Sequence, residues 1–371
     1  MSKAAELAAL IGSQTALSHR NIIINGAMQV WQRGTTIDSI SSGKYLCDRW
    51  RINHGGTDGN VDVDRSTDLP SGQGFGYSQK ISMDASESSL DAADKLVIQQ
   101  KFEGQNLQLL AKGTSGAKKT TVSFFVKSSV ASTYTVELVD NDNTRQLSKS
   151  YTINSANTWE QKSLTFEGDT SGSLDTDANT SMTLNFYIDT GTNHTSGTFN
   201  DSAWASTDDT KRVFNTTGWL ESTSPEFYIT GVQWELGEQA TPFEHRSYAD
   251  ELRRCQRYYE TSFDSDPSTT NTSNNGLIAS GGIAGDTTTS FSPEASATYK
   301  VSKRAVPTVT FYDLATGRNT GKCHRFQLGA QAHDNSAITI ADSGLTRFNA
   351  YSGSGNACSG IAFHYEADAE L

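Results

Sequence analysis

The feature that most constrains the fold of this 371-residue chain is a series of short apolar runs separated by turn residues. Gly, Asn, Asp and Ser crowd the positions between the runs, and several runs alternate apolar and polar residues with the period of a β-strand. We predict strands in the first two thirds of the chain at Ile22–Trp31, Cys47–Ile52, Gln79–Met83, Lys95–Glu103, Thr120–Lys127, Tyr134–Val139, Lys149–Ile153, Glu160–Phe166, Met182–Tyr187 and Glu226–Leu236. Short strands between such turns favour a β-sandwich.

The stretch from Ile229 to Tyr259 divides the chain. Its first part alternates apolar and polar residues as far as Leu236, which predicts the last strand of the sandwich. Pro242 lacks a backbone donor and keeps the chain extended, and Ser247 then offers an N-cap for a short helix. The first β domain is therefore expected to end just before this helix.

One apolar stripe runs along the predicted helix. Its members follow one another at steps of four, three and four residues: Tyr248, Leu252, Cys255 and Tyr259. This spacing suits the seam of a coiled coil, so the stripe is a candidate oligomer or interdomain contact. Packing of the helix against its own β domain is the alternative, and the spacing permits it equally.

The chain after the helix predicts a Ser/Thr/Asn-rich linker and then a second β domain. Its strands are expected at Ser296–Val301, Thr308–Tyr312, Cys323–Leu328, Thr339–Ala341 and Ile361–Tyr365. At the other end, Leu7 and Ile11 lie on one stripe of a short amphipathic segment, which is either an attachment arm or a frayed terminus. The predicted parts are an arm (1–19), a β-sandwich (20–246), a connector helix with linker (247–275) and a C-terminal β domain (276–371).

Charge and cysteine usage exclude several classes of function. The formal net charge of −12, with no Lys/Arg run, argues against a nucleic-acid partner. Glu6 interrupts what would be the apolar core of a signal peptide, and no apolar run is long enough to span a bilayer. We therefore expect synthesis in the cytoplasm and no membrane insertion. The four cysteines have no C-x-x-C spacing, so buried thiols are expected rather than a zinc site or a redox pair.

Three blocks of sequence resemble one family. They are Arg20–Gly34 followed by Asp48-Arg49-Trp50, then Ile229–Glu260, which contains ITGVQWELG and ATPFEHRSYADELRRCQRYYE, and the C-terminal Phe363–Leu371. These blocks resemble tailed-phage virion structural proteins, fibre-like ones in particular, which carry a carbohydrate-binding-module-like jelly-roll domain. The resemblance implies a jelly-roll β-sandwich, a location in the virion, a homo-trimer, and attachment to other virion proteins through the N-terminal arm.

The resemblance also implies possible contact with host cell-surface polysaccharide. Aromatic side chains that sit in polar loops or on a surface are candidates to stack on a sugar ring, and we select Trp204, Trp219, Tyr312 and Tyr351. The other tryptophans lie within or beside strand patterns and are expected to pack in the core: Trp31, Trp50, Trp159 and Trp234. Modules of this shape often hold a structural calcium, but the corresponding places carry Gln29 and Gly231, so neither metal nor cofactor is expected.

Catalytic patterns do not stand out. The histidines lack metal-ligand spacing, no G-x-S-x-G precedes a helix, and the acid pairs lie in polar turns. We therefore expect a non-enzymatic virion protein, most simply a tail fibre or a fibre-like appendage. A polysaccharide depolymerase, or a head decoration or tail component without host contact, are the alternatives that remain open.

Overall fold

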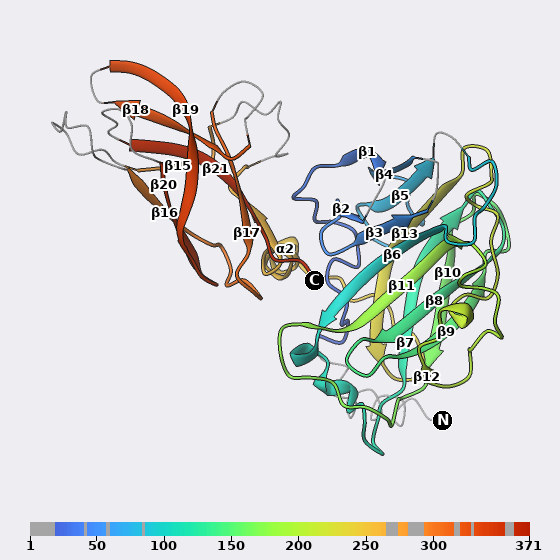
Figure 1. Cartoon of the computed structure of the whole chain (residues 1–371). Helices are drawn as coiled ribbons and strands as arrows, with labels where there is room; N and C mark the ends of the chain where they lie inside the picture. The colour runs from blue at the N-terminus through green and yellow to red at the C-terminus, as the bar shows by residue number, and fades with distance from the viewer. Residues whose placement is uncertain are drawn as a thin grey trace. The chain divides into compact units, whose positions relative to one another are not determined.

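The computed structural model describes residues 19–40, 43–56, 60–83, 86–264, 274–280, 293–314, 320–327, 330–352 and 360–371. The chain divides into two compact units (Figure 1). Gln32–Gly34 and Ala249–Glu370 belong to the second unit, and the rest of the described chain belongs to the first. The attachment-arm residues Leu7 and Ile11 lie outside the described residues.

Two antiparallel sheets form the first unit. The β13 sheet contains, in order, β1 (Thr36–Ile40), β4 (Val61–Ser66), β5 (Ser78–Met83), β13 (Glu226–Leu236), β7 (Thr120–Ser128) and β10 (Glu160–Phe166). The β11 sheet contains, in order, β12 (Ala205–Ser206), β9 (Arg145–Thr152), β8 (Thr133–Asp140), β11 (Thr180–Thr190), β6 (Lys95–Glu103), β3 (Arg51–Gly55) and β2 (Lys44–Tyr45). The expected jelly-roll β-sandwich is confirmed.

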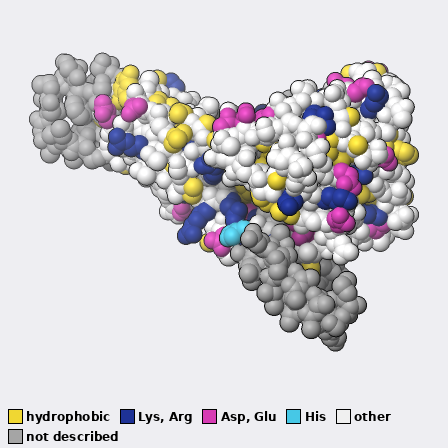
Figure 2. All heavy atoms as spheres, turned by 90° about the horizontal axis from the view of Figure 1, so that it is seen from below, with side chains coloured by type: hydrophobic (Ala, Val, Ile, Leu, Met, Phe, Trp, Pro, Cys, Tyr) yellow, Lys and Arg dark blue, Asp and Glu magenta, His cyan; other side chains and the backbone are white. Residues whose placement is uncertain are grey.

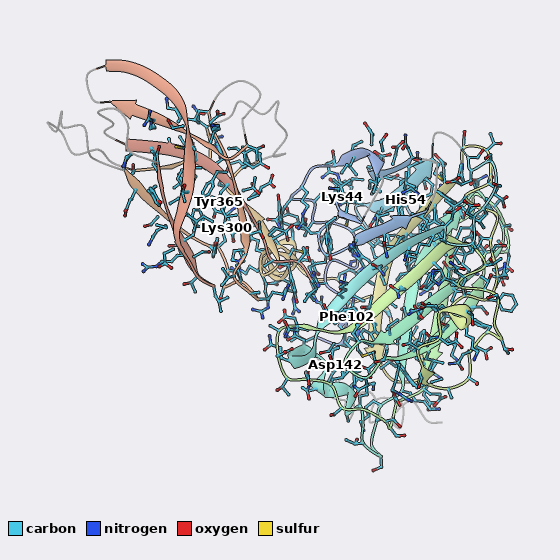
Figure 3. The ribbon with its side chains drawn as sticks, in the orientation of Figure 1. Lys44, His54, Phe102, Asp142, Lys300 and Tyr365 are labelled. Carbon is cyan, nitrogen blue, oxygen red and sulfur yellow. The ribbon has the colours of Figure 1, made fainter. Side chains whose placement is uncertain are left out.

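The core of the first unit lies between these sheets and is rich in aromatic rings. Phe124 of β7 meets Phe186 of β11 edge to face, with ring centroids 5.0 Å apart. Phe102 of β6, labelled in Figure 3, meets the fully buried Trp234 of β13 in the same way at 5.0 Å. Contacts between opposite sheets fix how the two layers pack, because edge-to-face rings are directional.

The predicted strand Ile22–Trp31 is wrong, because side chains replace a strand ladder there. Asn21 Oδ1 accepts hydrogen bonds from the amides of Ile23 and Trp234, at 3.0 and 3.1 Å. Asn25, at a φ of 59°, accepts through Oδ1 from the Gln29 and Val30 amides. These bonds satisfy the backbone locally, so the segment folds as turns. The other strands predicted before residue 246 overlap observed ones, whereas β1, β2, β4 and β12 are missing from the prediction.

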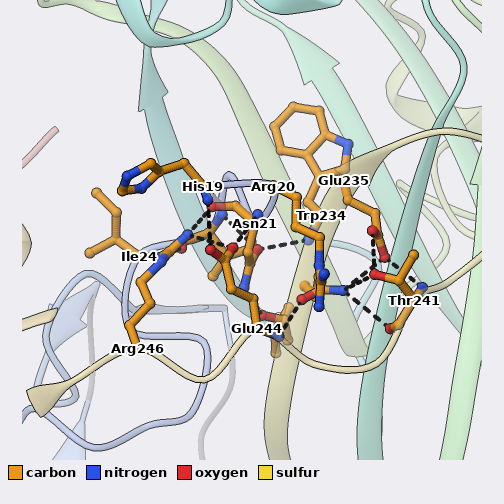
Figure 4. A network of polar contacts seen from close by, with 12 residues as sticks. His19, Arg20, Asn21, Ile24, Trp234, Glu235, Thr241, Glu244 and Arg246 are labelled. Atoms are coloured by element: carbon orange, nitrogen blue, oxygen red, sulfur yellow. Dashed lines mark hydrogen bonds and ion pairs between the residues drawn. The ribbon is translucent and has the colours of Figure 1, made fainter. Parts of the chain in front are cut away.

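A network of polar contacts ties the opening segment to the chain that follows β13 (Figure 4). The Glu244 carboxylate accepts the amides of His19 and Asn21, each at 2.7 Å. The Arg246 guanidinium donates to the carbonyl oxygens of Asn21 and Ile23. Two of the three sequence blocks that carry the family resemblance therefore meet in space, and their polar residues close the sandwich. We refer to the network around Glu244 and Arg246 as the clasp.

Glu244→Gln is expected to lower the free energy of unfolding by about 1–2 kcal/mol at neutral pH, because it weakens two charge-assisted bonds. Burial alone would raise the pKa of Glu244, but the Asn21 and His19 amides and the Arg246 and Arg20 charges outweigh it and hold that pKa below its ordinary value. A carboxyl with a lowered pKa stabilises the fold above its unfolded-state pKa and loses that contribution as the pH falls.

Denaturant unfolding between pH 7 and pH 3, followed by tryptophan fluorescence, measures this effect. All six tryptophans lie between residues 31 and 234, so the signal reports on the first unit. The difference between wild type and Glu244→Gln should shrink below about pH 4. A difference that stays constant with pH would contradict the assignment.

Gly231 occupies a bulge in the pairing of β13 with β7, where the register shifts between Thr230 and Gln233. Its φ is 63°, and a Cβ placed there would lie 2.5 Å from Phe75 Cζ and 2.9 Å from Phe125 Cδ2. Gly231→Ala is therefore expected to cost about 2–3 kcal/mol of stability through backbone strain and steric overlap. Gly218→Ala is the matched control, because Gly218 also has a positive φ of 74° but open space around its Cβ position. That control should cost about 1 kcal/mol, and equal costs in the two variants would show that the overlap relaxes.

The second unit is built from one helix and a β-sheet. α2 (Tyr248–Gln256) leads into an antiparallel sheet that contains, in order, β14 (Tyr259–Thr261), β21 (Gly360–Asp368), β18 (Lys322–Gln327), β19 (Ala330–Ser343), β20 (Arg347–Ser352) and β16 (Glu294–Thr298), while β15 (Ile278–Ala279) and β17 (Thr308–Tyr312) also pair with β21. Every strand predicted in this part of the chain overlaps an observed one. The smaller C-terminal β unit is confirmed, and α2 from Ala249 onward lies in the same unit as β14 and the strands that follow.

The predicted seam is not an exposed helix stripe. Tyr248 is 55% exposed, but Cys255 is buried. Tyr259 is buried too, and it lies in β14 and not in the helix. The Cζ atom of Arg33 lies 3.6 Å from the centroid of the Tyr259 ring. Leu252 is half-buried. The helix ends before Tyr259 because the chain turns into β14 to pair with β21, so the stripe is divided between α2 and β14.

Cysteine burial agrees with the prediction where the structure describes it. Cys47, Cys255 and Cys323 are buried, and Cys358 lies outside the described residues.

Candidate functional site

The long connection between β11 and β13 covers part of the outer face of the β11 sheet. Arg212, in this connection, reaches Glu137 of β8 and donates to both carboxylate oxygens at 2.9 and 3.1 Å. Val213 packs beside it against Tyr187 and Val97. The loop is therefore anchored to the sheet by one ion pair and one small apolar cluster.

The ion pair is held in a polar setting that is closed to solvent. The Glu137 side chain is fully buried, and it also accepts from Asn185 at 2.8 Å and from the Tyr187 hydroxyl at 3.3 Å. Burial alone would lower the pKa of Arg212, but the Glu137 carboxylate outweighs burial and raises that pKa. The guanidinium therefore stays charged and fixes where the loop lies.

Beside this anchor, the loop and β9 enclose an open hollow of about 760 Å³. It is lined by one aromatic ring and by many hydrogen-bonding groups: Gln146, Thr198, Phe199, Asn200, Ser202, Ala205, Ser206, Thr207, Asp208 and Lys211. Its volume lies within the range of about 300–1,000 Å³ found for small-molecule sites. We call this set of residues the hollow.

Local hydrogen bonds give the hollow a defined wall. β12 pairs with β9, placing Ala205 opposite Gln146. Gln146 and Asp208 exchange side-chain to backbone bonds at 3.2 Å in both directions. Asp208 also caps the short 3-10 helix η4 (Asp209–Lys211) by accepting from the Thr210 amide at 3.1 Å. Hydrogen bonds from Lys211, 2.8 Å away, and from Thr210 lower the pKa of Asp208 to about 2, so its carboxylate is ionised at neutral pH.

Trp204 does not line the hollow but borders a separate, much smaller cavity of about 20 Å³, which Lys112 and Trp234 also line. It is half-buried against the core, and its indole nitrogen donates to the Glu167 carbonyl oxygen at 2.7 Å. Arg145 donates to the Trp204 carbonyl oxygen at 3.2 Å and forms an ion pair with Asp169 at 2.7 Å. Lys112 bridges the same Asp169 at 3.0 Å. Trp204 therefore anchors the loop, and the neighbouring Phe199 offers the ring that lines the hollow.

The structure excludes Trp219 as a sugar contact, because its side chain has no exposed surface. The Asp189 carboxylate accepts the amides of Thr217 and Leu220, at 2.8 and 3.0 Å, and the loop segment between them carries Trp219 into the core. The length and polarity of the loop predicted that Trp219 would be exposed to solvent, but the loop folds back on the sandwich.

The candidates in the second unit are half-buried. Tyr312 of β17 packs edge to face on Phe263 at 5.7 Å, and burial together with Glu366 raises the pKa of its hydroxyl. Tyr351 lies on β20 opposite Glu294 of β16. These two tyrosines belong to the second unit and the two loop tryptophans to the first.

Sequence reasoning missed Phe199, Asn200 and Gln146 as site residues, and it assigned Trp159 to the core. Trp159 is half-buried and is absent from the buried core cluster that contains Trp31, Trp50, Trp219 and Trp234. The available signal was its position at the end of a polar turn, directly before β10. The signal for Phe199 was an aromatic residue inside the long polar loop.

The charges on the molecular surface are mixed. Figure 2 shows Lys/Arg and Asp/Glu side chains interspersed on the face that it presents, among a larger area of uncharged groups. Among the described residues, no cluster of His, Cys, Asp and Glu side chains could hold a metal ion. The lining of the hollow combines one aromatic ring with amide, hydroxyl, carboxylate and ammonium groups. In the part of the chain that the structure describes, no helix has the length and apolar character needed to cross a bilayer.

No protein-family model matches the sequence, and no curated protein matches it. Among solved structures, the chain is similar to the enzymatically active domain of tailspike protein 4 of bacteriophage CBA120, at 14% identity and a TM-score of 0.33, over 59% of this chain and 22% of that chain. It is also similar to a CBM4 structure, at 14% identity and a TM-score of 0.30, over 57% of this chain and 98% of that one. A family 11 carbohydrate-binding module of a Clostridium thermocellum cellulase matches at 15% identity and a TM-score of 0.28, over 54% of this chain and 99% of that one. With TM-scores this low, none of these likenesses indicates the function of this chain.

Proposed function

We propose that this chain is a non-enzymatic structural protein of a tailed-phage virion, a tail fibre or fibre-like appendage, whose β-sandwich contacts glycans of the host surface through the hollow. The observation that carries the glycan part is the lining of the hollow. Phe199 contributes an aromatic ring, while the Asn200 side chain and the hydroxyls of the loop offer hydrogen bonds. Stacking together with directional polar contacts is the chemistry that recognises a sugar ring.

The virion part of the proposal is supported by the sequence blocks that resemble fibre-like proteins. Two of these blocks form the clasp, in which Glu244 and Arg246 hold the opening segment. In the block around Asp48-Arg49-Trp50, Trp50 is buried and donates to the Asn25 carbonyl oxygen at 3.0 Å. The residues of these blocks therefore stabilise the β-sandwich itself. This agrees with a resemblance to fibre-like proteins that share a jelly-roll domain.

The non-enzymatic part is supported by the acid content of the hollow. Glycoside hydrolysis requires two carboxyl groups that flank the scissile bond. The lining contains one carboxylate, Asp208, and that carboxylate is bound to Lys211 and to the Thr210 amide. An ionised and paired carboxylate cannot act as the general acid of such a reaction.

Binding to an array of bacterial surface polysaccharides and oligosaccharides tests the glycan assignment. Phe199→Ala is expected to weaken binding about tenfold or more, since loss of a ring that stacks on a ligand costs about 1–3 kcal/mol. Leu109→Ala is the matched control, because Leu109 is an apolar side chain of the same unit, 42% exposed, and does not line the hollow. Equal binding by wild type and Phe199→Ala to every glycan would remove the hollow from the function.

Two further measurements separate the alternatives. Release of reducing ends from a bound polysaccharide would identify a depolymerase and contradict the non-enzymatic assignment. Labelling of virions with an antibody to this chain should mark a tail appendage, whereas label on the head would indicate a decoration protein.

A further inference from the structure

We infer that the outer face of the β13 sheet carries a second glycan-binding surface, centred on Trp159, that takes neutral sugars. This inference goes beyond the proposed function, because the hollow is built by the β11 sheet and its loop. The surface consists of Trp159 with Asp64, Asp68, Glu226 and Lys80, together with Tyr228 and Lys127, which are largely buried and contact the Trp159 ring. We call this set of residues the platform.

Strand register places the platform on one face. Lys80 of β5 pairs with Tyr228 of β13, and Tyr228 pairs with Lys127 of β7. Directly paired residues of neighbouring strands point to the same side of a sheet. The residues next to Tyr228 in β13, Phe227 and Ile229, are buried in the core, so Tyr228 and its partners face outward.

Polar contacts hold the Trp159 ring in place without burying it. Its indole nitrogen donates to Asp68 Oδ1 at 2.8 Å, and Lys127 binds the other oxygen of the same carboxylate. The Tyr228 ring meets Trp159 at 6.2 Å in a T-shaped arrangement. Lys127 Nζ lies 4.1 Å from the Tyr228 ring centroid and 5.9 Å from that of Trp159. An aromatic side chain that is outside the core but fixed by an ion pair and a neighbouring ring is preorganised for stacking.

The groups around the ring decide the class of sugar. Asp68 and Glu226 keep 45% and 39% of their side chains exposed, so their carboxylates can accept hydrogen bonds from sugar hydroxyls. Lys80, bound to Glu226 at 2.7 Å, supplies a donor. Asp64, paired with Lys80 in the register, adds a third acid beside the two lysines. The acids outnumber the lysines, so the platform disfavours uronic acids and other anionic sugars.

The test is affinity gel electrophoresis of the full chain in gels that contain neutral polysaccharides (dextran, mannan, galactan) or acidic ones (alginate, polygalacturonate). Retardation of the wild type is expected in at least one neutral gel and not in the acidic gels. Trp159→Ala should weaken this binding at least about tenfold, and Trp159→Phe, which keeps a ring but loses the bond to Asp68, should weaken it less. Thermal unfolding of each variant verifies the fold.

Each outcome decides between the two sites. Loss of binding in Trp159→Ala but not in Phe199→Ala supports the platform, and the reverse result overturns the platform while leaving the hollow intact. Loss in both variants with Leu109→Ala unchanged supports two sites that bind one polysaccharide. Retardation in the acidic gels, or none in the neutral gels, overturns the inference.

Discussion

Arg212→Met is expected to lower the free energy of unfolding of the first unit by about 3–5 kcal/mol. The substitution leaves the Glu137 carboxylate fully buried with no cation beside it. Asn185 and Tyr187 continue to donate to the carboxylate, but neither carries a charge. Removing one partner of a buried ion pair costs far more than the pair contributes, because the remaining charge has lost its water. Denaturant unfolding followed by tryptophan fluorescence measures the change.

Two control variants separate charge from packing. In Arg212→Met with Glu137→Gln, the glutamine can still bond to Asn185 and Tyr187, so most of the lost stability should return. Arg212→Lys keeps a charge but has a single nitrogen, so it cannot bind Glu137 and Asp209 through separate nitrogens as Nη1 and Nε of Arg212 do, and its stability should fall between wild type and Arg212→Met. A double variant no more stable than Arg212→Met would contradict the ion-pair explanation.

The same variant tests how the hollow is built. Arg212 directly follows Lys211, which lines the hollow, and it also binds Asp209 at 2.7 Å. Hydrogen exchange in the 198–211 segment should rise in Arg212→Met, and glycan binding through the hollow should fall with it. Faster exchange with unchanged binding would show that the hollow does not need the anchor.

Lys303→Met is expected to destabilise the second unit by a similar amount, about 3–5 kcal/mol. Lys303 and Glu260 are both fully buried and lie 2.8 Å apart. Burial lowers the pKa of Lys303 against the opposing charge of Glu260. Tyr365 donates to the other oxygen of Glu260 at 2.7 Å, and the amide of Lys300 donates to the oxygen that Lys303 binds. The pair therefore connects β14, the chain before β17, and β21.

Hydrogen exchange of peptides from β14 and β21 measures this effect, since the second unit contains no tryptophan. Lys300→Met is the matched control. Its backbone amide still bonds to Glu260, and its side chain binds the Thr261 carbonyl oxygen but no carboxylate. If the amides of Lys303→Met are protected from exchange as well as those of Lys300→Met, the buried Lys303–Glu260 pair adds little to stability.

The residue pattern alone determined the class of fold and most of its strands. The runs at Tyr134–Val139 and Met182–Tyr187 lie within β8 and β11, because apolar and polar residues alternate along them as they do in a strand with one face toward the core. Pro242 and Ser247 marked the end of the sandwich for reasons that are also local. Proline keeps the chain extended, and serine caps the helix that follows. Periodicity and turn chemistry act over a few residues, so a sequence displays them directly.

What only the tertiary structure decided depends on partners distant in the chain. Asn21 and Asn25 replaced a predicted strand with turns by bonding to Trp234 and to nearby amides. Trp219 entered the core and Trp159 stayed outside it, contrary to their settings in the sequence. Exposure of a side chain is fixed by contacts such as that of Trp159 with Asp68, 91 residues away, and such contacts leave no periodic trace in the sequence. The sequence therefore specified the sandwich, and the tertiary contacts decided which of its aromatic rings can meet a ligand.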